Sequence, residues 1–432
     1  MTAMTILLLL GLLFLLLGTG QWIGLALLGV AWFGMGLYTP RPAGDAMAIT
    51  VWGASTSWTL TALPLFIWMG EILFRTRLAA DMFKGLAPWL GFLPGRLLHT
   101  NVLGCAIFAA VSGSSAATCA TIGRMNLPEL KERGYPDGIS IGTLCGAGTL
   151  GLLIPPSIIM IVYGISANVS IAELFIAGVV PGIVLALLFM GVIVVWALLN
   201  PDQIPPAIDE TPTLRKKLAA SGGLLPVVVL IIMVLGSIYT GLATPTEAAA
   251  VGVVGSLVIA LFQRTMTRTV FAESLKGTMH TYCMISLILI GANFLTLAMG
   301  YLGLPRQLAE WIGGMGLSPA ALIVALTLFY IVLGCFLEGI SMVVLTIGVL
   351  LPTIQNAGID LVWFGVFIVL VVEMAQITPP MGLNLFVLQG ITGRQITWIG
   401  ARTLPMLLML VLMVALTYKF PAIVTWLPAQ MR

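Results

Sequence analysis

Val102-Leu-Gly-Cys105, Val111-Ser-Gly-Ser-Ser115 and Gly148-Thr-Leu-Gly-Leu-Leu-Ile-Pro-Pro-Ser157 mark one apolar stretch that small, polar and proline residues interrupt twice. A similar pattern returns later, where Val332-Leu-Gly-Cys335 precedes Glu338-Gly-Ile-Ser341 and Gln376-Ile-Thr-Pro-Pro-Met-Gly382. Two copies of an apolar segment with a broken centre are typical of a secondary transporter built from repeats. We therefore interpret the rest of the chain as the frame around these two copies.

The composition predicts a membrane protein. The 432 residues are 59% hydrophobic and 8% charged, with a mean hydropathy of +1.10, whereas soluble domains carry roughly 25% charged residues. The apolar runs are long and do not alternate with polar residues, so they indicate helices rather than the strands of a barrel. We therefore expect an all-α polytopic membrane protein. No dense basic stretch beyond Arg215-Lys-Lys217 is present, so nothing predicts a nucleic-acid partner.

Most apolar segments have the length of a helix that crosses the hydrocarbon core, about 20 residues. Two further segments, 76–90 and 303–315, each carry a tryptophan and are predicted to lie at the interface as amphipathic helices. The apolar segments are 4–18, 21–39, 49–72, 98–127, 138–168, 172–199, 222–241, 244–262, 280–301, 319–357, 361–391 and 402–420.

Segments 98–127 and 319–357 have polar or glycine-rich centres and are predicted to be re-entrant hairpins rather than crossings. Basic residues flank the first of them on both sides, and a hairpin leaves both groups in the cytoplasm, as the positive-inside rule requires. The chain then has ten crossings and two hairpins, with both termini outside. The basic residues that remain outside are Arg41, Arg306, Lys419 and Arg432.

The odd number of crossings in each half predicts an inverted repeat. Each repeat holds five crossings and one hairpin, and the hairpin is followed by a broken helix. The predicted parts are a first repeat at 1–199 with its hairpin at 98–127 and its broken helix at 138–168, a polar cytoplasmic linker at 200–221, and a second repeat at 222–432 with its hairpin at 319–357 and its broken helix at 361–391.

The hairpin tips and helix breaks predict sodium sites. Non-helical backbone at membrane depth occurs only where it is buried in protein or lines a wet cavity. Carbonyl groups at the C-terminal ends of half-helices suit a cation, and Ser and Thr hydroxyls complete an oxygen cage. The alternative is that these small residues only permit close helix packing. The predicted ligands are Ser112, Ser114, Gly148 and Thr149 in the first repeat and Gly339, Ser341, Thr378 and Met381, through its backbone, in the second.

Three glutamates are predicted to be buried acids, because they lie in apolar surroundings where a charge is costly and usually functional. Glu338, at the second tip, either helps to bind a cation or faces the substrate. Glu373 lies one turn before Thr378 and is expected to brace the second break. For Glu247 we favour a hydrogen-bonding role at a helix start, because an acid suits the N-terminal turn.

Several catalytic functions are disfavoured. Gly138-Ile-Ser-Ile-Gly142 matches the nucleophile elbow of serine hydrolases, but that motif needs a strand–turn–helix context and here it opens a membrane helix. We expect no histidine in a buried span to act as a base. The chain has no phosphate loop, so ATP bound to it does not drive transport. Scattered cysteines and only two histidines predict neither a transition-metal centre nor an organic cofactor.

The motifs resemble those of the large membrane subunit of TRAP (tripartite ATP-independent periplasmic) transporters. The similarity spans nearly the whole chain, and the combination of motifs is specific. One departure is Glu338-Gly-Ile-Ser341, which stands where an Asp-Pro-Thr-like run is expected. The matching motifs are Ser112-Gly-Ser-Ser-Ala-Ala-Thr118, Gly148-Thr-Leu-Gly-Leu-Leu-Ile-Pro-Pro-Ser157, Thr244-Pro-Thr-Glu-Ala-Ala-Ala250 and Thr378-Pro-Pro-Met-Gly-Leu-Asn-Leu-Phe-Val387.

The resemblance implies a sodium-coupled symporter of the elevator type in the bacterial inner membrane. A periplasmic binding protein would deliver a small organic acid, and a small four-helix membrane subunit would complete the transporter. The hairpins and broken helices would move against a scaffold made of the remaining helices. The substrate is expected between the two tips, near Ser115, Ser157, Glu338 and Asn384.

Three alternatives stay open. A stand-alone sodium/dicarboxylate symporter or ion antiporter of related hairpin architecture would share the cages but need no binding protein. A channel is a second alternative, although two occluding hairpins favour alternating access. A membrane enzyme is the third, and it lacks an evident base and metal ligands. C4-dicarboxylates, sialic acids, keto acids and ectoine all remain candidate substrates.

Overall fold

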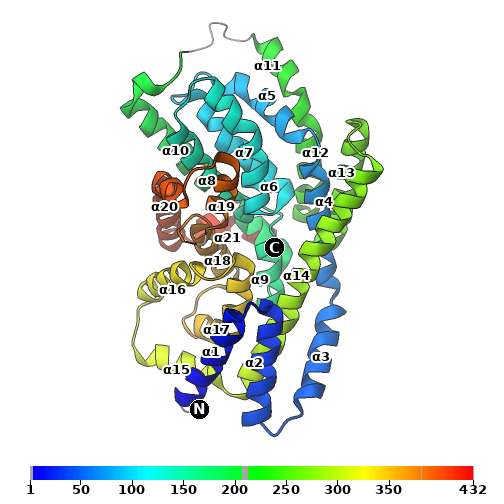
Figure 1. The fold of residues 1–432 in the computed structure, drawn as a ribbon, viewed down its shortest axis with the longest axis vertical. Helices are drawn as coiled ribbons and strands as arrows, with labels where there is room; N and C mark the ends of the chain where they lie inside the picture. The colour runs from blue at the N-terminus through cyan, green and yellow to red at the C-terminus, as the bar shows by residue number, and fades with distance from the viewer. Residues whose placement is uncertain (1–2, 207–212, 381, 432) are drawn as a thin grey trace.

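The computed structural model describes residues 3–206, 213–380 and 382–431, and within these ranges every regular element is a helix (Figure 1). The α-helices are α1 Ala3–Gly18, α2 Ile23–Tyr38, α3 Ala43–Ser55, α4 Ala62–Phe74, α5 Leu78–Leu90, α6 His99–Ser112, α7 Ser115–Glu132, α8 Asp137–Leu153, α9 Ile158–Ala167, α10 Ile171–Leu199, α11 Leu214–Ser221, α12 Leu225–Tyr239, α13 Pro245–Phe262, α14 Arg268–Tyr301, α15 Leu304–Gly314, α16 Pro319–Gly334, α17 Gly339–Asn356, α18 Leu361–Gln376, α19 Leu383–Thr392, α20 Ile396–Lys419 and α21 Ala422–Ala429.

The predicted all-α membrane fold is confirmed. Six helical segments of the described chain are long and apolar enough to cross a membrane, or up to eight if each bent helix pair is one span. Helices α1 and α2 have 16 residues each, about 24 Å at 1.5 Å per residue, and fall short of the ~30 Å hydrocarbon core. The total of ten crossings stays a prediction.

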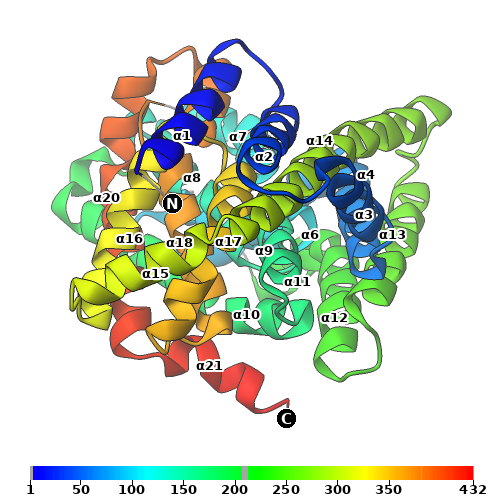
Figure 2. The ribbon, with the colours of Figure 1, turned by 90° about the horizontal axis from the view of Figure 1, so that it is seen from below.

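Most predicted segments match helices, and three features differ. Helix α14 begins at Arg268 rather than near residue 280 and reaches 34 residues. Helix α11 lies inside the segment expected to be a polar linker, and α21 follows the last predicted crossing. In both views α12 and α13 lie at one side of the molecule and α16 and α20 at the other (Figures 1 and 2).

Contacts between the two halves of the chain occur in exchanged pairs. Helix α2 packs against α14, and α13 packs against α4. Likewise α8 contacts α20 while α10 contacts α18, and α7 contacts α19 while α17 contacts α9. In each case the first contact becomes the second when every helix is replaced by its counterpart in the other half, with the helices of the two halves matched in chain order. The repeat boundaries at residues 199 and 222 stay predictions.

Local sequence explains the hairpin tips. Helix α6 ends at Ser112 because Gly113 adopts a left-handed conformation, with φ +61°, which glycine reaches without steric cost. Ser114 then caps α7 by accepting a hydrogen bond from the Ala117 amide. At the second tip α16 ends at Gly334, and Glu338 is the residue that precedes the first turn of α17.

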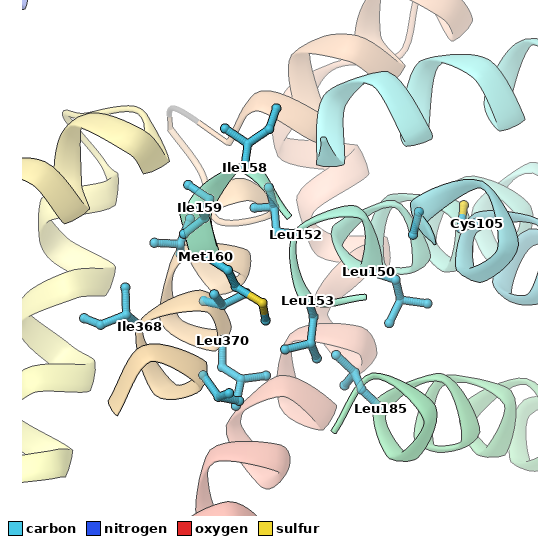
Figure 3. Close-up of a cluster of buried hydrophobic side chains, with 14 of the residues drawn as sticks. Cys105, Leu150, Leu152, Leu153, Ile158, Ile159, Met160, Leu185, Ile368 and Leu370 are labelled. Atoms are coloured by element: carbon cyan, nitrogen blue, oxygen red, sulfur yellow. The ribbon is translucent and has the colours of Figure 1, made fainter. Parts of the chain in front are cut away.

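Proline pairs break the two helices that follow the hairpins. Helices α8 and α9 meet at a 40° bend around the cis Pro155–Pro156 bond, and α18 and α19 are separated at the cis Pro379–Pro380 bond. Apolar side chains pack around the first break (Figure 3), and the end of the Met160 side chain lies against α10, where a Cβ atom on Gly178 would be 2.6 Å from Met160 Cε. A Cβ atom on Gly178 of α10 would lie 2.7 Å from the Leu153 carbonyl oxygen, so this packing is tight.

Candidate functional site

Both hairpin tips and both helix breaks line one cavity of about 60 Å³. Ligand pockets usually enclose roughly 300–1,000 Å³, so this cavity accommodates only part of an organic ligand. A larger crevice of about 380 Å³ between α10, α12 and α21 is lined by apolar residues and Tyr239, and it offers no oxygen cage. The small cavity is lined by Gly113, Ser114, Ser115, Ala116, Leu152, Ile158, Ile159, Glu338, Ile340, Gln376 and Leu383.

The first tip is tied to itself and to the start of α9. Ser112 Oγ and Thr118 Oγ1 lie 2.7 Å apart, and Thr118 Oγ1 donates to the Ser114 carbonyl at 2.8 Å. The Ile158 amide donates to the Gly113 carbonyl at 3.4 Å. The predicted ligands Ser112 and Ser114 therefore belong to one hydrogen-bonded turn that contacts the first break.

Gly151 is the residue of α8 on which this tip rests. A Cβ atom there would lie 2.5 Å from the Ser114 carbonyl oxygen and 2.7 Å from Thr118 Oγ1. The predicted ligand Gly148 lies one turn earlier, where a Cβ would meet Cys119 Cβ at 2.8 Å. Gly151 was not among the predicted site residues, although the spacing Gly148-x-x-Gly151 indicates a glycine face on a helix.

The second tip packs against the end of α18. A Cβ atom on Gly339 would lie 2.5 Å from Val372 Cγ1 and 3.2 Å from Gln376 Nε2. Ser341 is fully buried, and its Oγ donates to Glu338 Oε2 at 3.4 Å. Gly339 and Ser341 thus lie beside the second break, as the two predicted ligands of the first tip lie beside the first.

The threonines at the breaks bond to their own helices. Thr149 Oγ1 donates to the Gly146 carbonyl at 2.7 Å, and Thr378 Oγ1 donates to the Met374 carbonyl at 2.6 Å. In this structure both hydroxyl protons are therefore used within the helix. The fourth predicted ligand of the second site, Met381, lies outside the described residues.

The predicted substrate residues are only partly brought together. Ser115 Oγ donates to Asn384 Oδ1 at 2.9 Å, and Asn384 Nδ2 donates to the Cys145 carbonyl at 3.1 Å, so this contact joins the two halves. Ser115 and Glu338 both line the cavity. Ser157 is fully buried, caps α9 by accepting from the Met160 amide at 3.3 Å, and does not line the cavity.

The prediction that Glu247 is buried is wrong. Glu247 is exposed and forms a capping box with Thr244 at the start of α13, in which Glu247 Oε2 accepts from the Thr244 amide at 2.8 Å. The hydrogen-bonding role at a helix start is confirmed. The carboxylate lies at the first turn because the N–H groups there have no partner within the helix. A capping side chain in this position stays exposed at the helix end.

Two buried side chains of α18 have unpartnered acceptors. Glu373 is fully buried, and neither carboxyl oxygen has a hydrogen-bond partner among the described residues. Its expected bracing of the second break stays a prediction. Gln376 is 6% exposed, lines the cavity, and its Oε1 has no partner in the same ranges. Gln376 was not among the predicted site residues, although an amide side chain two residues before Thr378-Pro-Pro380 is a polar group next to a predicted helix break.

The residues that match the nucleophile-elbow motif do not form a turn between a strand and a helix. Ser140 lies inside the continuous helix α8, and its carbonyl accepts from Asn101 Nδ2 at 3.0 Å. The expectation that no histidine is buried in a span is wrong, because His99 opens α6 with no exposed surface. Its Nε2 lies 2.8 Å from the Pro94 carbonyl, so the ring is held by the loop before the hairpin.

Comparisons with known proteins agree with the motifs. The family model described as "Tripartite ATP-independent periplasmic transporter, DctM component" matches residues 10–423. The chain is 35% identical over 388 residues to a C4-dicarboxylate TRAP transporter large permease protein of Pseudomonas aeruginosa, covering 89% of each. It is 31% identical over 376 residues to an ectoine/5-hydroxyectoine TRAP transporter large permease protein of Ruegeria pomeroyi, covering 85% of this chain and 86% of the relative.

A third relative and a solved structure complete the comparison. The sialic acid TRAP transporter large permease protein of Vibrio cholerae is 29% identical over 379 residues, 87% of each chain. The YdaH transporter of Alcanivorax borkumensis has the same fold, with a TM-score of 0.60 at 15% identity, covering 86% of this chain and 88% of the other. The chain therefore belongs to the DctM family, the large membrane permease component of TRAP transporters.

Proposed function

We propose that this permease imports a small organic acid across the bacterial inner membrane, driven by a sodium gradient and by elevator-type alternating access. The observation that carries the proposal is the single cavity lined by both tips and both breaks. A site built from the broken helices of two repeats is typical of secondary transporters. The substrates named for the relatives range from C4-dicarboxylates to sialic acid and ectoine.

Backbone carbonyls at the two breaks support sodium binding. A helical carbonyl pairs with the N–H four residues later, and proline has none. The carbonyl of Leu152 therefore lacks its helical partner because of Pro156, and that of Gln376 lacks its partner because of Pro380. Both residues line the cavity. The ligands would be these carbonyls together with the tip residues Ser112, Ser114, Gly339 and Ser341 and with Gly148, Thr149, Thr378 and Met381.

Glycine contacts support movement of the hairpins against a scaffold. A Cβ atom on Gly70 of α4 would lie 3.1 Å from the Ser112 carbonyl oxygen at the first tip. In the second half, Gly348 of α17 lies against Thr296 of α14. Close approaches at small residues place no large side chains between the helices, which suits one group of helices moving along another. We propose that α2, α4, α13 and α14 belong to the scaffold.

We propose that two further proteins complete the transporter, a small four-helix membrane subunit and a periplasmic binding protein, and the word tripartite in the family's description supports this number. Both termini of the permease face the periplasm in the proposed orientation. A stand-alone symporter would transport without a binding protein, and a channel would give a flux that does not saturate.

Proteoliposomes test the proposal. The permease and its small subunit are reconstituted with an inward gradient of sodium or of potassium, and uptake of a labelled organic acid is measured with and without the binding protein. We expect saturable uptake that requires both sodium and the binding protein. Uptake that is equal in potassium would contradict sodium coupling, and uptake without the binding protein would favour the stand-alone symporter.

A further inference from the structure

A second polar pocket lies at the end of α8 that is remote from the tips. Its volume is about 250 Å³, and its walls are the last turns of α7 and α19 and the start of α8. These three helices pack against one another (Figure 1). At 1.5 Å per residue, the part of α8 between this pocket and the first break is roughly 20 Å long. The pocket is therefore separate from the cavity between the tips.

Charged residues begin at this pocket, after long uncharged stretches. No Asp, Glu, Lys or Arg occurs at 138–172 or at 374–393. Asp137 directly precedes the first stretch, Arg394 directly follows the second, and both line the pocket. This end of the helices is therefore at the membrane–water boundary, and in the proposed orientation it faces the cytoplasm. Anionic lipids give the cytoplasmic leaflet a negative surface potential, which attracts Lys and Arg.

Positive charge exceeds negative charge at this pocket. Lys131, Arg394 and Asp137 line it, and Arg394 Nη2 donates to Asp137 Oδ2 at 2.7 Å. Arg402 lies beside it, because a Cβ atom on Gly138 would be 3.5 Å from Arg402 Nε. Within the part of the chain that the structure describes, neither Lys131 nor Arg402 forms an ion pair. Three cations therefore meet one carboxylate here, and that carboxylate is already paired.

The neighbouring side chains keep this positive charge in place. Glu129 pairs with Arg133 at 3.3 Å, and Glu132 is exposed; none of these three residues lines the pocket. The guanidinium carbon atoms of Arg394 and Arg402 lie 5.1 and 5.6 Å from the ring centre of Trp398. Such cation–π contacts orient a guanidinium group, and tryptophan is common at membrane–water boundaries. Both arginines are therefore held near the pocket.

Two buried hydroxyl groups add hydrogen-bond donors to the pocket wall. Ser140 lines the pocket and is 3% exposed, and its Oγ has no hydrogen-bond partner among the described residues. Tyr135 also lines the pocket, and its hydroxyl oxygen accepts from the Leu97 amide at 3.2 Å, so the hydroxyl proton is available to a ligand. Buried polar groups in native proteins are almost always hydrogen-bonded, and an exception calls for an absent partner. The absent partner of Ser140 is an acceptor in this pocket.

We propose that this pocket binds an anionic phosphate group, and that the headgroup of an anionic phospholipid supplies it. A phosphate offers more acceptor oxygens than a carboxylate, which suits ammonium, guanidinium and hydroxyl donors that come from three helices. Basic pockets between membrane helices on the cytoplasmic side bind anionic lipid headgroups. The lipid source rests on the proposed orientation, whereas the phosphate site itself does not. Bound here, the phosphate links the hairpin helix α7 to α8 and α19, one from each broken helix.

Lipid titrations of the permease purified with its small subunit test this proposal. The melting temperature is measured in detergent micelles that contain phosphatidylglycerol or phosphatidylcholine at the same mole fraction. A third series contains no lipid and compares glycerol 3-phosphate with chloride at equal ionic strength. We expect phosphatidylglycerol to raise the melting temperature more than phosphatidylcholine, whose choline group compensates the phosphate charge. An equal rise with glycerol 3-phosphate would keep the phosphate site but overturn the lipid as its source.

Charge variants then locate the phosphate. Lys131→Gln and Arg402→Gln should each weaken the binding of phosphatidylglycerol about fivefold, and Lys131→Arg should retain it. Arg268→Gln is the matched control, because it removes one exposed positive charge at the start of α14, a helix that packs against α2 and α4. The control should bind the lipid as the wild type does. An equal loss in Arg268→Gln would indicate attraction by net charge alone and would overturn the site.

Ser140→Ala separates a role in binding from a role in folding. Removing a buried hydroxyl group that has no partner should leave the melting temperature without lipid unchanged or higher. The response to phosphatidylglycerol should nevertheless become weaker, because the phosphate loses a donor. A variant that responds to the lipid as the wild type does would remove Ser140 from the site.

The outcome does not depend on the proposed transport function, because the assay contains no transported substrate and holds the sodium concentration constant. The proposal is overturned if neither phosphatidylglycerol nor glycerol 3-phosphate raises the melting temperature beyond its control. It is also overturned if Lys131→Gln and Arg402→Gln both keep the full response of the wild type.

Discussion

Gly151→Ala tests the contact between the first tip and α8. The added methyl group would lie 2.5 Å from the Ser114 carbonyl oxygen and 2.7 Å from Thr118 Oγ1. Carbon–oxygen contacts are normally no closer than about 3.3 Å, so the tip must retreat by about 1 Å. Ser114 cannot yield by rotating a side chain, because the nearer atom belongs to its backbone.

The expected cost follows from overpacking. Inserting a methyl group into a close-packed contact costs about 1–3 kcal/mol. The proposed sodium site requires the tip to rest on α8, so the added methyl group destabilises the sodium-bound state. A destabilisation of about 1.4 kcal/mol corresponds to a tenfold loss of affinity. We therefore expect the sodium affinity of Gly151→Ala to fall at least about fivefold.

The assay is the melting temperature of the permease as a function of sodium concentration. Gly191→Ala is the matched control, because Gly191 lies inside α10 and an added Cβ there would meet nothing within 4 Å. The control should be unchanged or slightly more stable, since alanine favours a helix over glycine. A sodium titration of Gly151→Ala that overlays the wild type would refute the role of this contact in ion binding.

Three further outcomes are expected. Gly70→Ala should slow uptake while the melting temperature changes little, because its Cβ would lie only 3.1 Å from the Ser112 carbonyl on the sliding surface; equal uptake rates would argue against that surface. Thr244→Ala should lower the stability of the folded state by about 1 kcal/mol through loss of the capping box, measured by thermal unfolding; an unchanged melting temperature would contradict the contribution of the cap. A cysteine in place of Lys131 should react with an impermeant thiol reagent only from the cytoplasm, and labelling from outside would overturn the hairpin topology.

Local sequence signals were sufficient for the tips and breaks. Gly113 ends α6 because only glycine takes a left-handed conformation at no steric cost, and Pro155 and Pro156 break a helix because they lack N–H groups. Basic residues on both sides of segment 98–127 predicted that the chain turns back inside the membrane instead of crossing it. These signals depend on neighbours in the chain, so they can be predicted without knowing the tertiary structure.

The errors concern properties that depend on distant parts of the chain. Gly151 is important because Ser114 lies against it; the spacing Gly148-x-x-Gly151 predicts a glycine face but does not show what packs on that face. Gln376 was missed because only the folded cavity shows that its Oε1 has no donor. Glu247 was predicted to be buried from its apolar flanks, but a capping acid lies at the first turn of a helix, where it stays exposed.

The central claim is that the tips and breaks form sodium sites, and thermal stability in sodium against equal potassium tests it most directly. A ligand that binds only the folded state stabilises it by RT ln(1 + [L]/Kd), about 2.7 kcal/mol at a hundredfold excess over Kd. We predict a sodium-specific rise in melting temperature that is reduced in Ser112→Ala and in Thr378→Ala. Equal melting temperatures in the two salts, or a sodium rise that both variants retain in full, would contradict the account.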